Sequence, residues 1–192
     1  MVVRHVLKKA MLSTGNNKNS RGHTAKECAL LAVFVAVVIA SQTVFSAIPG
    51  VEIVTVLFVT YSFSAGWKMG TLAATAFSLL RQIVFGFFPT VLILYLVYYN
   101  LLALCFGLLG RKIKKPIKAL PLIVIIACFG TVLFSVIDNI ITPLWYGYSE
   151  RAARAYFFAS LPFMLPQVIC TAISVTCLFL PLWKVFKRFY LR

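Results

Sequence analysis

The sequence predicts an all-α integral membrane protein with six transmembrane helices in one bundle and both termini in the cytoplasm. Three observations support this fold class. First, 61% of the residues are hydrophobic and only 12% are charged, whereas a water-soluble domain carries about 25% charged residues. Second, several apolar stretches approach the roughly 20 residues that a helix needs to cross a bilayer. Third, the basic residues are distributed unevenly along the chain.

The Lys and Arg residues concentrate in every second connection between the predicted spans, as expected for a membrane protein. Of the 19 Lys and Arg residues, 16 lie in the N-terminal tail, in the connections after the second and fourth spans, or in the C-terminal end. The other three are Arg81, Arg151 and Arg154, in the alternate connections. Because loops rich in Lys and Arg stay in the cytoplasm, this split predicts a multi-pass cell-membrane protein with both termini inside. The net charge of +15 then reflects topology, and we expect no nucleic-acid partner.

Residues 1–27 form a basic cytoplasmic tail, residues 28–188 the six-helix membrane domain, and residues 189–192 the cytoplasmic end. The start of the tail fits either a short helix on the surface of anionic membrane lipid or a solvated segment. The first span, residues 28–47, repeats Ala32, Ala36 and Ala40 at every fourth position. This spacing places small side chains on one helix face, where a helix of the same bundle or of a partner can approach closely.

The later spans are delimited by helix breakers and polar runs. We expect them at residues 53–65, 71–85, 90–109, 119–141 and 157–180. The first of these is short for a crossing and would have to tilt, thin the bilayer or be shielded by its neighbours. Residues 142–156, which contain Pro143 and several aromatic residues, are predicted to form a polar connection.

The sequence holds none of the residue patterns of common enzymes. Both histidines, His5 and His23, lie in the tail, so no Ser-His or Cys-His pair can form within the membrane. The glycines and lysine at residues 107–112 lack the spacing of a phosphate-binding loop, and no metal-ligand spacing occurs. We therefore expect no enzymatic activity, no metal and no cofactor. Uphill transport would need an ion gradient or another subunit.

Residues 78–100 are the predicted centre of a ligand site, because charge, aromatic faces and helix breakers meet there. Arg81 either reaches the interface or pairs with an acid, or it donates to a carbonyl, phosphate or carboxylate of a ligand. The aromatic residues form either an interfacial belt or the walls of a pocket. Gln167 lies deeper in its span, where it either binds a ligand or forms an interhelical hydrogen bond with no ligand role. The full candidate set is Glu52, Arg81, Gln82, Phe88, Tyr95, Tyr99, Asp138, Asn139, Trp145, Tyr146 and Gln167.

Several features recur in a fixed order along residues 28–188. They are Ala32-x-x-x-Ala36 in the first span, the run Ile-Pro-Gly-Val-Glu-Ile-Val-Thr at residues 48–55, a short second span, Phe85-Gly86 and Pro89 at the end of the third, and Thr142-Pro143 before the sixth. In this order the features resemble the substrate-binding S components of energy-coupling factor (ECF) transporters. The resemblance covers nearly all of the chain except its tail.

The resemblance implies a six-helix membrane protein that captures a vitamin or related micronutrient on the outer side. It also implies association with a transmembrane T component and two cytoplasmic ATPase subunits. The alanine motif of the family, which meets the T component, would fall on Ala32 and Ala36, and Ala25, Ala29 and Ala40 offer the same spacing. The implied ligand-binding loops contain Glu52, residues 81–89 and residues 143–156.

The leading hypothesis is therefore a capture subunit of an ATP-driven micronutrient importer, with a cobalamin-like, flavin-like or other heterocyclic ligand. A competing hypothesis is a self-contained, ion-coupled carrier or channel for small solutes. A third is a membrane scaffold or sensor that binds no solute. The residues do not identify a particular vitamin.

Overall fold

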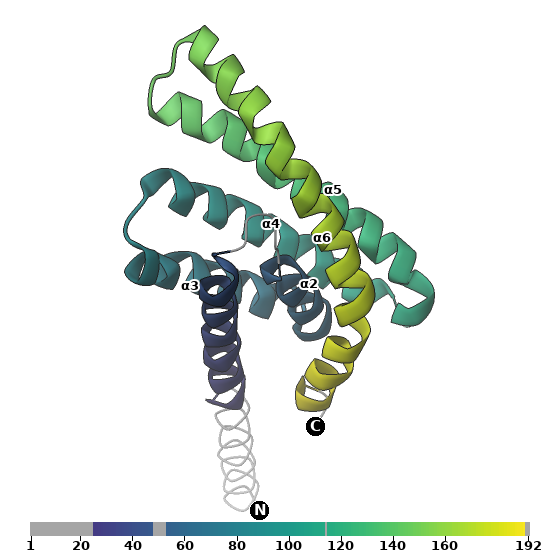
Figure 1. Cartoon of the computed structure of the whole chain (residues 1–192). Coiled ribbons are helices and arrows are strands. Elements are labelled where there is room, and N and C mark those ends of the chain that lie inside the picture. The colour runs from purple at the N-terminus through teal and green to yellow at the C-terminus, as the bar shows by residue number, and fades with distance from the viewer. Residues whose placement is uncertain (1–24, 48–52, 114, 191–192) are drawn as a thin grey trace, which may run out of the picture.

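The computed structural model describes residues 25–47, 53–113 and 115–190. Every regular element within these residues is a helix, which confirms the all-α prediction. In chain order, as Figure 1 shows, the helices are Ala25–Phe45, α2 (Val54–Ala65), α3 (Trp67–Phe85), α4 (Pro89–Lys112), α5 (Pro116–Trp145) and α6 (Glu150–Tyr190). Most of the predicted tail, together with Glu52, lies outside the described residues.

Glycine and proline set the boundaries between the helices. Gly66 separates α2 from α3 with a φ of 86°, and Gly86 ends α3 with a φ of 92°. Residues other than glycine rarely adopt such a backbone conformation. Pro89 and Pro116 begin α4 and α5 at positions where the missing N–H leaves no hydrogen bond unmade. These four residues therefore divide residues 54–145 into four helices.

The short helix α2 is the central element of the fold. Ten of its 12 residues are buried, and the helix contacts each of α3, α4, α5 and α6. The N-terminal helix, Ala25–Phe45, also packs against it, because the ring of Phe34 stacks on Tyr61 at 3.9 Å and meets Phe58 edge-on at 5.4 Å. Shielding by neighbours, one of the three ways in which so short a span could be accommodated, is thus observed.

Two glycines of α4 allow the turn between α2 and α3 to approach closely. A Cβ atom added to Gly107 would overlap the backbone of Trp67 at the start of α3. One added to Gly110 would overlap the backbone carbonyl of Phe63 near the end of α2. Small residues let helix backbones approach in this way, and here they fix the position from which α3 runs to Arg81.

The hairpin formed by α5 and α6 is longer than the sequence predicted. The predicted connection at residues 142–156 is wrong, because α5 continues to Trp145, with Pro143 inside it, and α6 begins at Glu150. At 1.5 Å per residue the 30 residues of α5 and the 41 of α6 extend about 45 and 60 Å. In Figure 1 this hairpin diverges from the α3–α4 hairpin and projects beyond it.

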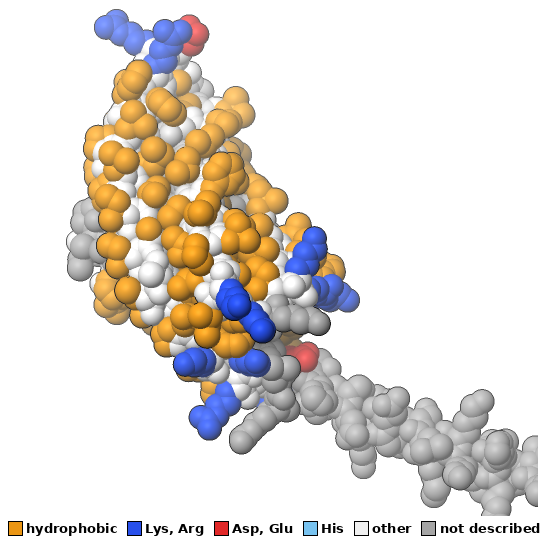
Figure 2. Space-filling model, turned by 90° about the vertical axis from the view of Figure 1, so that its right-hand side faces the viewer, with side chains coloured by type: hydrophobic (Ala, Val, Ile, Leu, Met, Phe, Trp, Pro, Cys, Tyr) orange, Lys and Arg blue, Asp and Glu red, His pale blue; other side chains and the backbone are white. Residues whose placement is uncertain are grey.

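Within the described residues, four helices are long and apolar enough to cross a membrane, namely Ala25–Phe45, Pro89–Lys112, Pro116–Trp145 and Glu150–Phe189. The helix α2 is apolar but shorter, and α3 is not among the four. Figure 2 shows hydrophobic side chains over the middle of one face and Lys and Arg side chains toward its two ends. This distribution indicates a membrane protein, while six crossings and the orientation of the termini stay predictions.

Candidate functional site

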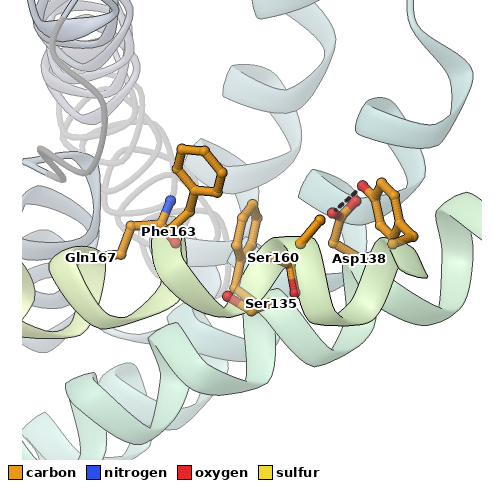
Figure 3. Close-up of a pocket in the computed structure, with 8 residues that line it drawn as sticks. Ser135, Asp138, Ser160, Phe163 and Gln167 are labelled. Carbon is orange, nitrogen blue, oxygen red and sulfur yellow. Dashed lines mark hydrogen bonds between the residues drawn. The ribbon is translucent and has the colours of Figure 1, made fainter. Parts of the chain in front are cut away.

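A cavity of about 310 Å³ lies between α5 and α6, in the part of the hairpin closer to residues 146–149. It is lined by Phe134, Ser135, Asp138, Tyr156, Ala159, Ser160, Phe163 and Gln167. Figure 3 shows Asp138, Phe163 and Gln167 projecting on the same side of the hairpin. Aromatic walls with a few polar groups are typical of sites for small molecules.

Polar residues recur at helical spacing along the contact between the two helices. On α5 they are Thr131, Ser135, Asp138 and Thr142, and on α6 they are Tyr156, Ser160, Gln167 and Thr171. Spacings of three and four residues place such side chains on one helix face. Where the two rows meet, the hydroxyl oxygens of Thr131 and Thr171 lie 2.9 Å apart and are buried. The cavity therefore occupies the part of this polar contact that is nearer residues 146–149.

The carboxylate of Asp138 is held by hydrogen bonds on both of its oxygens. The Tyr156 hydroxyl donates to Oδ2 at 2.8 Å, shown as a dashed line in Figure 3, and the Thr142 hydroxyl donates to Oδ1 at 2.8 Å. Among the described residues the only ion pair joins Arg154 to Glu150, at 3.3 Å. Asp138 is thus half-buried and positioned by neutral donors, without a cation from the described part of the chain.

Next to Asp138, the Asn139 side chain leaves an acceptor unused. Its Nδ2 donates to the Ser160 hydroxyl at 2.9 Å, and that hydroxyl donates to the carbonyl of Phe157 at 2.8 Å. Because the Ser160 proton is engaged with Phe157, its oxygen must accept from Asn139, which orients the amide. Asn139 Oδ1 is then buried without a hydrogen-bond partner among the described residues. A buried acceptor of this kind costs about 1–3 kcal/mol until a donor reaches it.

A second polar cluster joins the N-terminal helix, α3 and α4. Arg81 Nε donates to Gln42 Oε1 at 3.2 Å, and Gln42 Nε2 donates to the Tyr95 hydroxyl at 2.9 Å. The Arg81 guanidinium also lies over the rings of Phe85 and Tyr95, at 4.9 and 4.6 Å from their centroids. Its Nη1 is buried and finds no partner in the described part of the chain.

Gln82, the residue after Arg81, supports the turn between α3 and α4. Its Oε1 accepts a hydrogen bond from the backbone N–H of Phe88 at 3.0 Å, and the side chain is buried. This bond closes the segment between Gly86 and Pro89 against the end of α3. The structure therefore gives Gln82 a role in the turn, and its Nε2 has no partner among the described residues.

The other predicted site residues lie apart from the cavity. Tyr99 is 1% exposed and packs against Phe58 and Phe77 in the core. Trp145 and Tyr146 are exposed at the end of the α5–α6 hairpin, and Phe88 is exposed in the turn before α4. The predicted partner-binding residues Ala32 and Ala36 are exposed on the N-terminal helix, and Ala40 continues the same row.

Five of the predicted residues thus fall into two groups rather than one. Asp138, Asn139 and Gln167 are at or beside the cavity, whereas Arg81 and Tyr95 belong to the second cluster. Phe134 connects the groups, because its ring lines the cavity and lies 5.9 Å from the ring of Tyr95 and 4.9 Å from that of Tyr98.

The candidate set from the sequence lacks Gln42, Phe134, Ser135, Tyr156, Ser160 and Phe163, although Tyr156 ends the implied ligand-binding loop at residues 143–156. The helical spacing of polar residues along α5 and α6 would have indicated Ser135, Tyr156 and Ser160. For Gln42 the only signal is a lone amide near the end of an apolar span. Within the described residues, no group of three or more His, Cys, Asp or Glu side chains is placed to hold a metal ion.

Comparisons with protein-family models, with curated proteins and with solved structures found no match for this chain.

Proposed function

We propose that this chain is the membrane-embedded, substrate-capture subunit of an ATP-driven micronutrient importer, of the ECF S-component type. The observation that carries the proposal is the cavity between α5 and α6, two helices of membrane length. Its lining includes an acid, Asp138, an amide, Gln167, and the aromatic rings of Phe134, Tyr156 and Phe163. Such a lining can hold a small molecule by hydrogen bonds and ring contacts. The sequence holds no phosphate-binding loop, which is consistent with ATPase subunits supplied by other chains.

The proposed location is the cell membrane, with both termini in the cytoplasm and the cavity nearer the outer side. The distribution of charge supports this orientation. Exposed basic residues gather where α4 ends, where α5 begins and where α6 ends, namely Arg111, Lys112, Lys115, Lys118, Lys184, Lys187 and Arg188. The far end of the α5–α6 hairpin carries Glu150, Arg151 and Arg154. Because cytoplasmic ends collect Lys and Arg, the cavity then faces outward.

The exposed alanines of the N-terminal helix support docking of a partner. Ala32, Ala36 and Ala40 lie on a surface that no described helix covers closely. A row of small residues lets a second helix approach its backbone. We propose that this row meets a transmembrane T component, to which two cytoplasmic ATPases attach.

The proposal is tested with the purified full-length chain in two preparations. Mass spectrometry of the gently purified protein should find a bound small molecule. Proteoliposomes that contain only this chain should then bind that molecule without accumulating it, because the energy-coupling subunits are missing. Liposomes without protein are the control for passive entry.

A second candidate, an ion-coupled carrier, is favoured by one observation. Asp138 lies within α5 and has no cationic partner in the described part of the chain, and acids placed inside spans are typical of ion-coupled transport. Accumulation driven by an ion gradient in proteoliposomes of this chain alone would establish the carrier and contradict the capture-subunit proposal.

A further inference from the structure

We infer that the α5–α6 cavity selects a ligand in which a protonated nitrogen is joined to a small, flat aromatic ring system. This inference rests on the proposed capture function, since it names the class of ligand that the same cavity takes. Three features of the lining lead to it: its charge, the unused acceptor positions of Asp138 and its shape.

The charge of the lining has one sign. Asp138 is the single ionisable acid of the cavity, and no Lys or Arg is among the residues that line it. The two hydrogen bonds from Tyr156 and Thr142 stabilise the carboxylate but leave its charge uncompensated. In an apolar surrounding such a charge favours an ion of opposite sign and disfavours a phosphate or carboxylate.

The Asp138 carboxylate also keeps acceptor positions unused. An ionised carboxylate has about four lone-pair positions, and two of those of Asp138 are filled by Tyr156 and Thr142. An ammonium or protonated ring amine supplies several N–H groups at once, which suits the remaining positions. A neutral hydroxyl supplies only one.

The shape of the cavity restricts the remainder of the ligand. Phe134, Tyr156 and Phe163 provide ring faces, which attract both flat ring systems and cations. The volume of about 310 Å³ lies at the lower end of the range of roughly 300–1,000 Å³ found for small-molecule sites. A ligand of one or two rings fits this space, whereas a corrinoid macrocycle, one of the ligand types expected from the sequence, is too large.

Equilibrium dialysis of the full-length protein in detergent tests the inference with three ring compounds of matched size. The probes are 4-aminoquinoline, which is protonated at neutral pH, uncharged quinoline, and anionic quinoline-4-carboxylate. We expect the cation to bind at least about tenfold more tightly than quinoline, since a hydrogen bond to a charged group has that effect or more. The carboxylate should bind most weakly.

Two variants then locate the preference. Asp138→Asn keeps the size of the side chain and should reduce the cation preference to within about twofold of quinoline. Glu150→Gln removes the same charge from the exposed Arg154–Glu150 pair at the end of the hairpin and should keep the preference. Loss of the cation preference in both variants would overturn its assignment to the cavity. A cation preference that is retained in Asp138→Asn would overturn it as well.

The inference and the proposed function fail in different ways. Tighter binding of the anion than of the cation would overturn the inference, even where the chain binds its ligand without transporting it. Accumulation by the isolated chain would overturn the capture function, even where the cation preference depends on Asp138.

Discussion

The close contact of α4 with the turn between α2 and α3 predicts a graded response to added methyl groups. In Gly107→Ala the new Cβ meets the backbone of Trp67, which cannot rotate away, so overpacking should cost about 3 kcal/mol, the upper end of its usual range. The change also improves helix propensity by about 1 kcal/mol. The expected net loss in the free energy of unfolding is therefore about 2 kcal/mol.

Gly130→Ala on α5 is the matched control. There the nearest atom to an added Cβ is Leu102 Cδ1 at 3.2 Å, the end of a flexible side chain. A small adjustment costing about 1 kcal/mol is offset by a gain in helix propensity of about the same size. The two glycine variants carry the same chemical change, so they isolate the effect of what the methyl group meets.

The assay is thermal unfolding of the purified protein in detergent, followed by the fraction that elutes as a folded species. For chains of this length each kcal/mol corresponds to about 2–4 °C, so Gly107→Ala should lower Tm by about 4–8 °C. Gly130→Ala should change Tm by less than about 2 °C. The packing argument is refuted if Gly107→Ala unfolds at the wild-type temperature, or if Gly130→Ala is destabilised to the same extent.

Three further predictions concern other contacts. Thr131→Val and Thr171→Val remove the two hydroxyl groups that lie 2.9 Å apart. In a double-mutant cycle of unfolding they should show a coupling energy of about 0.6 kcal/mol, at most about 1.7. Additive effects of the two changes would mean that the hydroxyl groups form no hydrogen bond. Gln42→Ala removes the hydrogen bonds to Arg81 and Tyr95 and should lower the free energy of unfolding by about 1–3 kcal/mol. The same thermal assay measures this loss. Wild-type stability of the variant would contradict a stabilising role for these hydrogen bonds. Ala36→Leu should abolish co-purification with the proposed T component and leave ligand binding in dialysis unchanged, and normal co-purification would show that the partner uses another face.

The helices themselves were largely predictable from the sequence. Apolar length and the breakers Gly66, Gly86 and Pro89 are local signals, and they place the ends of α2, α3 and α4 within a few residues. The exceptions are Pro143, which the sequence places in a connection, and the last span, which is predicted to end at residue 180, whereas α6 continues through Pro181 to Tyr190. A proline near the end of a membrane helix can be tolerated, because neighbouring groups satisfy the backbone that it frees. Here α5 continues for two residues beyond it.

The site was predictable only in part, because its composition depends on how the helices pack. Asp138, Asn139 and Gln167 stand out as polar residues in apolar segments, and the structure brings them to or beside one cavity. That Arg81 belongs elsewhere, with Gln42, depends on the N-terminal helix crossing near α3 and α4. No spacing within α3 contains that information. The sequence identified the polar residues, and the packing assigned them to their partners.

The burial of α2 has a consequence for the order in which this protein is built. A helix of 12 residues is too short to be inserted into a bilayer as an independent segment. It is enclosed by the N-terminal helix, through Phe34, and by the helices that follow it in the chain. The last of these is α6, so the polypeptide must be almost completely synthesised before α2 is enclosed. We expect chains truncated after α5 to leave α2 exposed and to be degraded, whereas loss of the N-terminal tail should not have this effect. In this protein the second helix to be synthesised is among the last to be packed.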